Sequence, residues 1–213
     1  MKNWLDKMER RFGRYAIRNL TMYLLAGYAI GYLLSFTMPQ LLTYFTLEPA
    51  LILKGQVWRL LSWVIIPPND NIIFVIFMML LYYSLGNTLE SYWGAFRYNV
   101  YIFSGILFTV IGAFIVNGLI GGITGFGSLY STYYINMSIF LACASIMPDY
   151  QLLLYGIIPI KMKWLAVLDV VLLAVDAVQG GLIIRIVIIA SLLNFIIFFF
   201  CNCSVNKITF IIT

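Results

Sequence analysis

Six long apolar segments are the feature of this sequence that most constrains its fold. They lie at 19–38, 71–89, 96–117, 129–147, 162–179 and 182–201. Each approaches the roughly 20 residues that a helix needs to cross a hydrocarbon core of about 30 Å. Backbone groups in lipid must hydrogen-bond within the chain, so these segments are expected to be helices. The pattern predicts an all-α polytopic membrane protein with six transmembrane helices.

The composition also indicates a lipid environment. The chain is 63% hydrophobic and only 10% charged, whereas soluble domains are about half apolar and a quarter charged. No soluble core of this size could bury so many apolar side chains. We expect one membrane domain over 19–201, followed by a short cytoplasmic tail over 202–213.

Residues 1–18 form an amphipathic segment. Trp4, Met8, Phe12 and Tyr15 recur at helical spacing among six cations. The pattern is typical of a helix lying in the plane of the lipid headgroups, and a flexible basic tail is the alternative. We interpret its charge as attraction to a membrane surface rather than as nucleic-acid binding.

The distribution of Lys and Arg predicts the orientation. If the amino-terminal segment is cytoplasmic, its six cations share that side with Arg97, Lys161, Lys163 and Lys207, which makes ten of the chain's 13. Cytoplasmic loops carry the excess of positive charge, so both termini are expected in the cytoplasm. The absence of a recognisable processing signal favours a bacterial plasma membrane.

The connection over 39–70 is unusually long and apolar. A connection of this length is usually functional or has structure of its own. Its Trp and aliphatic residues predict that it sinks partly into the outer leaflet. Gly27 and Gly31 in the preceding segment form a GxxxG motif, which permits a close approach, and we expect the partner to lie within this chain.

Three motifs, taken together and in order, resemble the rhomboid superfamily. The first is GQVWRLLSW, with Trp58 and Arg59 in the long first loop. The second is LESYWGAFRYNVYIFSG, with Glu90, Gly94 and Arg97 after the second apolar segment. The third is MPDYQLLLYGIIPIKMKWLAVLD, which contains Pro159, Lys161, Lys163 and Trp164. The resemblance covers about residues 15–200 and implies a six-helix rhomboid-like fold with a membrane-embedded first loop.

The charged residues of these motifs are expected to support the scaffold. Arg59 can donate to loop carbonyls or lipid phosphates, while Trp58 anchors the loop at the interface. Glu90 and Arg97 flank a tight turn. They could form an ion pair, or Glu90 could accept backbone donors at the start of the following helix.

The resemblance also implies a serine–histidine dyad that this chain does not have. The sequence contains no histidine and no GxSG motif, and a serine hydroxyl needs an adjacent base to become nucleophilic. Tyr133 or Tyr134 falls where the family places its nucleophile. Ser191 and Asn194 occur where a histidine would be expected.

Other catalytic pairs find little support. Lys161 and Lys163 lie at the cytoplasmic end, away from a site in the outer leaflet. Asp169 and Asp176 are seven residues apart on one helix, or about 10 Å, which is too far to share a proton.

Several polar side chains nevertheless lie within the apolar segments, where such groups are expensive and normally face the bundle or water. These candidate site residues are Asn136, Ser138, Asp169, Asp176, Arg185 and Asn194. Asp176 and Arg185 are expected at similar depth, within reach of an ion pair. The set forms either a satisfied network between helices or a hydrated cavity that receives a polar residue of a partner.

We therefore expect a catalytically inactive, Derlin-like member of the rhomboid superfamily. Its expected partners are the lipid bilayer and the transmembrane segments of client proteins, with no cofactor or metal. The alternatives are an intramembrane serine protease with a non-standard active site and a small membrane transporter. The sequence does not indicate an oligomeric state.

Overall fold

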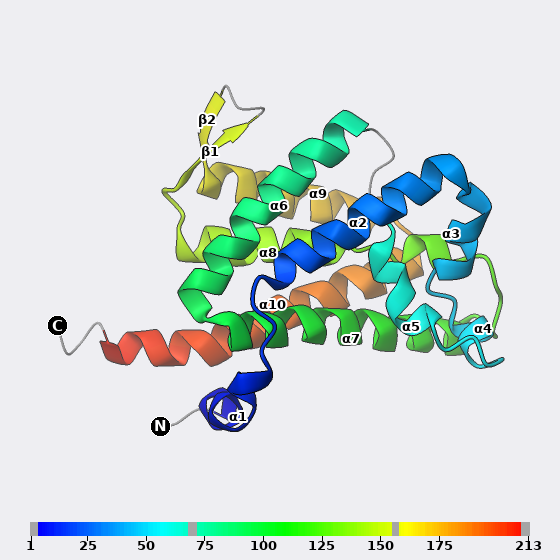
Figure 1. Cartoon of the computed structure of the whole chain (residues 1–213), viewed down its shortest axis with the longest axis horizontal. Coiled ribbons are helices and arrows are strands. Elements are labelled where there is room, and N and C mark those ends of the chain that lie inside the picture. The colour runs from blue at the N-terminus through cyan, green and yellow to red at the C-terminus, as the bar shows by residue number, and fades with distance from the viewer. Residues whose placement is uncertain (1–3, 68–71, 155–157, 210–213) are drawn as a thin grey trace.

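A computed structural model of the chain describes residues 4–67, 72–154 and 158–209. Its longer helices follow the six predicted segments: α2 (Leu20–Thr37), α6 (Ile72–Trp93), α7 (Ala95–Leu119), α8 (Tyr133–Ile146), α9 (Met162–Gln179) and α10 (Leu182–Thr209). The shorter helices are α1 (Trp4–Phe12), α3 (Pro39–Phe45), α4 (Pro49–Ile52) and α5 (Arg59–Ser62), with 3₁₀ turns η1 (Gly13–Tyr15), η2 (Trp63–Ile65) and η3 (Gly127–Leu129). Figure 1 shows their arrangement.

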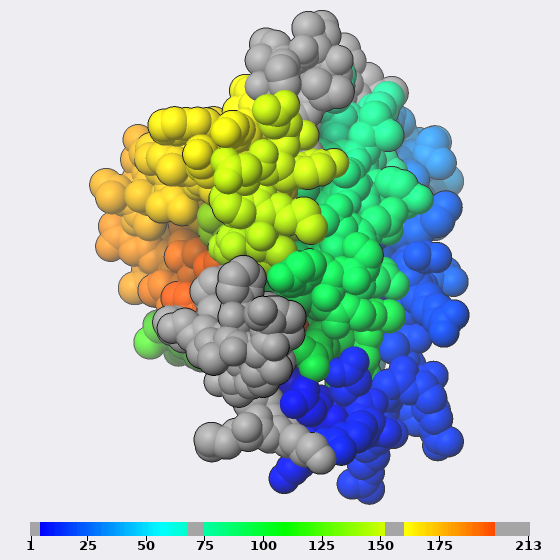
Figure 2. All heavy atoms as spheres, turned by 90° about the vertical axis from the view of Figure 1, so that its left-hand side faces the viewer, coloured from blue at the N-terminus to red at the C-terminus, as the bar shows by residue number. Residues whose placement is uncertain are grey.

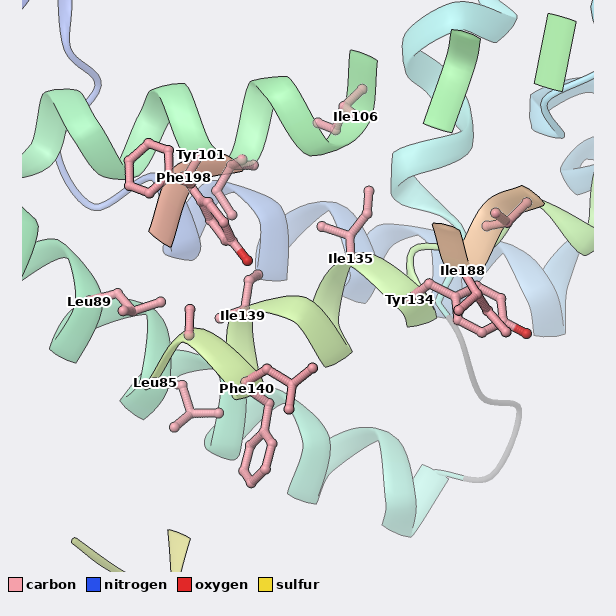
Figure 3. Packing of buried hydrophobic residues seen from close by; sticks show 14 of the residues in the cluster. Leu85, Leu89, Tyr101, Ile106, Tyr134, Ile135, Ile139, Phe140, Ile188 and Phe198 are labelled. Carbon is pink, nitrogen blue, oxygen red and sulfur yellow. The ribbon is translucent and has the colours of Figure 1, made fainter. Parts of the chain in front are cut away.

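Helix α8 lies at the centre of the bundle. It packs against α6, α7, α9 and α10, and ten of its 14 residues are buried. Ile139 points toward Tyr101 of α7, whereas Phe140 points to the opposite side, near Leu85 of α6 (Figure 3). The continuous apolar sequence of this helix is explained by neighbours on every side.

The helices differ in length in a way that matters for a membrane. Among the described residues, α2 and α7 are long and apolar enough to cross a bilayer, and Leu182–Phe198 of α10 is a shorter apolar helix. The 25 residues of α7 extend about 37 Å, whereas the 14 residues of α8 extend only about 21 Å. The helix predicted over 129–147 is thus shorter than expected, because α8 begins only at Tyr133, after η3 and a short connection.

The first loop is folded rather than extended. It consists of α3, α4, α5 and η2, and η2 packs on α2. The GxxxG motif faces this loop: a Cβ on Gly31 would overlap the backbone carbonyl of Ile65, and one on Gly27 would touch the Ile65 side chain. The loop leaves apolar side chains exposed, including Leu53, Val57, Trp58 and Leu61.

The chain reverses sharply on the other side of the molecule. Gly94, with a φ of +84°, joins α6 to α7 as a single residue, and a positive φ is easily reached only by glycine. An antiparallel hairpin of β1 (Gln151–Leu154) and β2 (Ile158–Lys161) precedes α9 and is a small departure from the predicted all-α fold. The hairpin and α1 lie toward one end of the bundle, and α3–α5 toward the other (Figure 1).

Candidate functional site

Two of the predicted polar residues hold α8 against its neighbours. Asn136 donates from Nδ2 to the hydroxyl of Tyr28 on α2, at 3.2 Å. Ser138 donates to the carbonyl of Ile135, at 2.7 Å, and accepts from the hydroxyl of Tyr101 on α7, at 3.0 Å. These side chains are buried, so their hydrogen bonds satisfy groups that lipid could not satisfy.

Helix α10 is joined to the bundle by a second polar cluster. Asn194 accepts from the Ser104 hydroxyl at 2.6 Å and donates from Nδ2 to the Tyr101 carbonyl at 3.1 Å. Ser191 donates to the carbonyl of Tyr134, at 2.5 Å. The residues that occupy the expected histidine position thus tie α10 to α7 and α8.

Asp169 differs from these residues because its hydrogen bonding is incomplete. It is only 5% exposed and lies on the one buried stripe of α9, with Met162 and Leu173. Its Oδ2 atom is buried and has no hydrogen-bond partner among the described residues. Tyr82 and Tyr133 lie close enough to interact with it electrostatically. A buried acceptor without a donor is destabilising, which distinguishes Asp169 from the hydrogen-bonded polar residues of α8 and α10.

The predicted ion pair between Asp176 and Arg185 is wrong. Arg185 donates from Nε to the Ala177 carbonyl at 2.8 Å and from Nη2 to the Val178 carbonyl at 3.4 Å. No salt bridge to Asp176 occurs in the part of the chain that the structure describes. The last carbonyls of a helix have no intrahelical donor, and the short turn after α9 places the guanidinium within their reach.

The six candidate residues therefore do not form one cluster. Ser138 and Asn194 are linked through Tyr101 of α7, whereas Asn136 bonds to Tyr28 of α2. None of the described hydrogen bonds joins Asp169 to these residues, and Arg185 is exposed at the α9–α10 turn.

The serines near the start of α8 do not have an activated geometry. Ser131 accepts the N–H of Tyr133 at 3.2 Å, and the Ser138 hydroxyl donates to a backbone carbonyl. Ser128 is exposed in η3. Tyr134 is buried, and the carboxylate of Asp176 lies close enough to interact with it electrostatically.

Arg59 organises the first loop. Its side chain is 3% exposed. Nη1 donates to the carbonyls of Thr43 and Thr46, at 2.8 and 2.9 Å, and Nε donates to Gln56 Oε1 at 2.7 Å. These carbonyls lie at the carboxyl-terminal end of α3, where a cation also complements the helix dipole. Trp58 is half exposed and donates to another carbonyl of α3. Arg59 is too buried to reach lipid phosphates.

Neither arrangement predicted for Glu90 and Arg97 occurs. Arg97 instead forms ion pairs with Asp6 and Glu9 of α1, at 2.8 and 2.9 Å. Glu90 accepts the N–H of Asn19, at the start of α2, at 2.8 Å. The amino-terminal helix, distant in sequence, supplies partners that the sequence pattern could not indicate.

The third motif supports the hairpin. Pro159 lies in β2, which pairs with β1. Lys161 and Lys163 approach Asp149 at 3.3 and 3.4 Å, and the hydrogen bond from Lys161, aided by the Lys163 charge, lowers the pKa of Asp149 from its ordinary value. Trp164 follows at the start of α9 and is 65% exposed.

Several residues that hold the fold together were not predicted from the sequence. Glu48, 6% exposed, accepts the N–H groups of Gly125 and Gly127 at 2.9 and 2.7 Å. An acid in the middle of an apolar loop was the available signal. Tyr28 and Tyr101 were missed because tyrosines are numerous in this chain and their partners are remote in sequence.

Comparison with known proteins identifies a family for this chain. A family model described as "Eukaryotic integral membrane protein (DUF1751)" matches residues 18–206. No curated protein and no solved structure matches the chain. The expectation of a bacterial plasma membrane is not borne out, because the matched family is eukaryotic. The match spans most of the 213 residues, and the chain therefore belongs to this family of eukaryotic integral membrane proteins, which reside in a lipid bilayer.

Proposed function

We propose that this protein is a rhomboid-like membrane protein without protease activity, which binds the transmembrane segments of client proteins. Helices α2, α6, α7, α8, α9 and α10 are its six spans in this proposal. Both termini are cytoplasmic. The grouping of α1 and the hairpin toward one end of the bundle (Figure 1) supports this orientation, because ten of the 13 Lys and Arg residues then share one side.

The absence of a general base supports an inactive site. The chain has no histidine, and the hydroxyl of Ser138 is engaged with Ile135 and Tyr101. A nucleophilic serine requires a base within hydrogen-bond reach and a third group that orients it. The described hydrogen bonds of Ser131 and Ser138 include no lysine or carboxylate.

The buried and incompletely hydrogen-bonded carboxyl of Asp169 is the main observation that supports a binding function. Its carboxyl faces the bundle from a helix whose other sides are apolar and exposed, at residues such as Leu168, Val171 and Val175. Polar groups within the membrane normally pair with one another, whereas Oδ2 of Asp169 has no partner in the described part of the chain. A client segment that carries a hydrogen-bond donor at this depth would satisfy it.

The short length of α8 would allow a client segment to approach the polar groups of the bundle from within the membrane. Helix α8 extends about 21 Å, less than the roughly 30 Å of the hydrocarbon core. Polar groups at its start, such as the buried Thr132, then lie inside the membrane rather than at its surface. A local thinning of the bilayer would accompany this arrangement.

The test is a binding assay in liposomes with single-span clients that differ at one position. One client has an all-apolar segment and the other has an asparagine at its midpoint. We expect the wild-type protein to retain the asparagine client preferentially, and Asp169→Leu to lose that preference. Asp176→Leu is the matched control, because it removes the same group two turns along the same helix and should keep the preference.

Cleavage is measured in the same assay. The expected result is intact client with the wild type and with Ser128→Ala, Ser131→Ala and Ser138→Ala. Cleavage that one of these variants abolishes would overturn the proposal in favour of an unusual protease. Equal retention of both clients would reject the role of Asp169, and the absence of both binding and cleavage would favour a transporter.

A further inference from the structure

An open groove runs between the segment that follows α1 and the first half of α7. It has a volume of about 360 Å³ and an apolar lining. Phe12, Tyr15 and Ile17 form one wall, and Asn99, Phe103 and Leu107 of α7 form the other. The residues of α7 are spaced by four, so they share one helical face that extends about 12 Å along the axis.

The charge around this groove is strongly positive. Both acidic side chains of α1, Asp6 and Glu9, are bound to Arg97 of α7. This contact fixes the segment against α7 and leaves five exposed cations without an acidic partner among the described residues: Lys7, Arg10, Arg11, Arg14 and Arg18. Figure 2 shows the amino-terminal segment, in blue, gathered at one end of the molecule.

Two of these cations lie directly over the aromatic wall. The guanidinium of Arg11 is 5.5 Å from the ring centre of Phe12, and that of Arg14 is 4.7 Å from the ring centre of Tyr15. Arg14 also donates to the Tyr15 hydroxyl, at 2.7 Å. The groove therefore has an apolar body and a cationic rim, held together by cation–π contacts.

The α7 wall of the groove contains a polar side chain that lacks a partner among the described residues. Asn99 lines the groove and is 5% exposed. Its Oδ1 atom is buried and accepts no hydrogen bond from the described residues. This amide oxygen without a donor lies beside the groove, in the α7 wall.

We propose that the groove binds one anionic phospholipid, with an acyl chain along α7 and the headgroup phosphate between Arg11 and Arg14. Basic pockets at the membrane surface commonly bind anionic headgroups in this way. A partner helix is the competing occupant, but the cationic rim formed by Arg11 and Arg14 complements an anionic headgroup. This inference is independent of client binding at Asp169.

The experiment is native mass spectrometry of the full chain, titrated with phosphatidylserine or phosphatidylcholine of identical acyl chains. We expect one phosphatidylserine to bind more tightly than phosphatidylcholine. Arg11→Gln combined with Arg14→Gln should weaken phosphatidylserine binding roughly 30-fold, since each cation near an anionic surface contributes about fivefold. Lys161→Gln combined with Lys163→Gln removes equal charge elsewhere and should leave binding unchanged.

A second pair of variants tests the apolar part of the site. Leu107→Trp fills the groove and should reduce binding of both lipids. Leu119→Trp is the control, because Leu119 is also exposed on α7 but lies outside the groove. Neither side chain is buried, so neither variant should impair folding.

Three results would overturn the proposal. The first is equal affinity of the wild type for the two lipids. The second is an equal loss in the Lys161 and Lys163 control, which would indicate only general charge. The third is displacement of the lipid by millimolar glycerophosphoserine or inorganic phosphate, which would indicate an anion site without a chain-binding groove.

Discussion

Glu48 and Gly127 join two loops that are distant in sequence: Oε1 of Glu48 accepts the Gly127 N–H at 2.7 Å, over 79 residues of sequence. The same oxygen accepts the N–H of Gly125. Glu48 begins α4 in the first loop, and Gly127 begins η3 before α8. One carboxylate therefore connects the first loop to the central helix, in a buried position where charge-assisted hydrogen bonds are strong.

This connection predicts that Glu48→Ala destabilises the fold. Two backbone donors would lose their acceptor, one of them fully buried, at a cost of about 1–3 kcal/mol. Gly127→Ala should also destabilise, because its Cβ would lie 2.8 Å from the Glu48 Cγ. Thermal unfolding in detergent measures both. Gly118→Ala meets nothing within 4 Å and should be neutral, so an equal effect there would contradict the assignment.

A second prediction concerns the attachment of α1. Arg97→Ala should release α1 from α7 by removing its pairs with Asp6 and Glu9. These side chains are partly exposed, so the pairs are worth about 1 kcal/mol, and tryptic cleavage within α1 should accelerate about fivefold. Arg97→Lys retains one charge and should have a smaller effect. Unchanged cleavage in Arg97→Ala would mean that apolar contacts alone hold the helix.

The two glycines of α2 should differ in their tolerance of alanine. A Cβ on Gly31 would overlap the Ile65 carbonyl, which is backbone and cannot rotate away, whereas one on Gly27 would lie 3.8 Å from the Ile65 side chain. We expect Gly31→Ala to lower the unfolding temperature and Gly27→Ala to be neutral or slightly stabilising, since alanine favours helices. Comparable unfolding temperatures for the two variants would contradict the packing of η2 on α2.

Replacement of Asp169 and of Asn194 with leucine should have opposite effects on the free energy of unfolding. Asp169 contains a buried oxygen without a donor, so Asp169→Leu should stabilise the free protein while it weakens client binding, as is typical where function opposes stability. Asn194→Leu removes hydrogen bonds to α7 and should destabilise by about 0.6–2 kcal/mol. Unfolding of the two variants in detergent is the measurement, and destabilisation by Asp169→Leu would argue for a purely structural carboxyl.

The contacts of the hairpin lysines predict a lowered pKa for Asp149, which lies outside the membrane-spanning helices. Lys161 and Lys163 lower the pKa of Asp149, so the ionised carboxylate favours the folded hairpin above the ordinary pKa of aspartate. This contribution is lost as the pH falls through the lowered value. NMR titration of the labelled carboxyl should find a pKa below the ordinary value of aspartate. Replacing both lysines with glutamine should return it to the ordinary range, and an unchanged pKa would exclude the pairing in solution.

The helices could be predicted from the sequence because their cause is local. An apolar run of sufficient length must form a helix in lipid, whatever it packs against. Predicted and observed bounds therefore agree closely for α2, α7 and α9. The start of α8 differs because η3 and its hydrogen bonds to Glu48 replace the expected first turn, and these bonds depend on a residue in another loop.

The polar site could be predicted only as a set of residues. Sequence shows that Asn136, Asp169 and Asn194 lie within apolar segments, where polar groups require partners. It does not show which partners they have, because Asn136 meets Tyr28 across 108 residues and Asn194 meets Ser104 across 90. Only the packing distinguished satisfied amides from the incomplete carboxyl of Asp169.

By itself, the sequence determined that this chain is a helical membrane protein, because apolar length and the hydrogen bonding of the backbone leave no other solution in lipid. Only the tertiary structure determined which groups the charged side chains bind. Arg97 binds α1 rather than Glu90, Arg185 binds helix carbonyls rather than Asp176, and Glu48 binds the glycine-rich loop. The physical reason is that a charge in an apolar environment is stabilised by the donors and acceptors that packing brings within about 3 Å, and distance along the chain does not determine these.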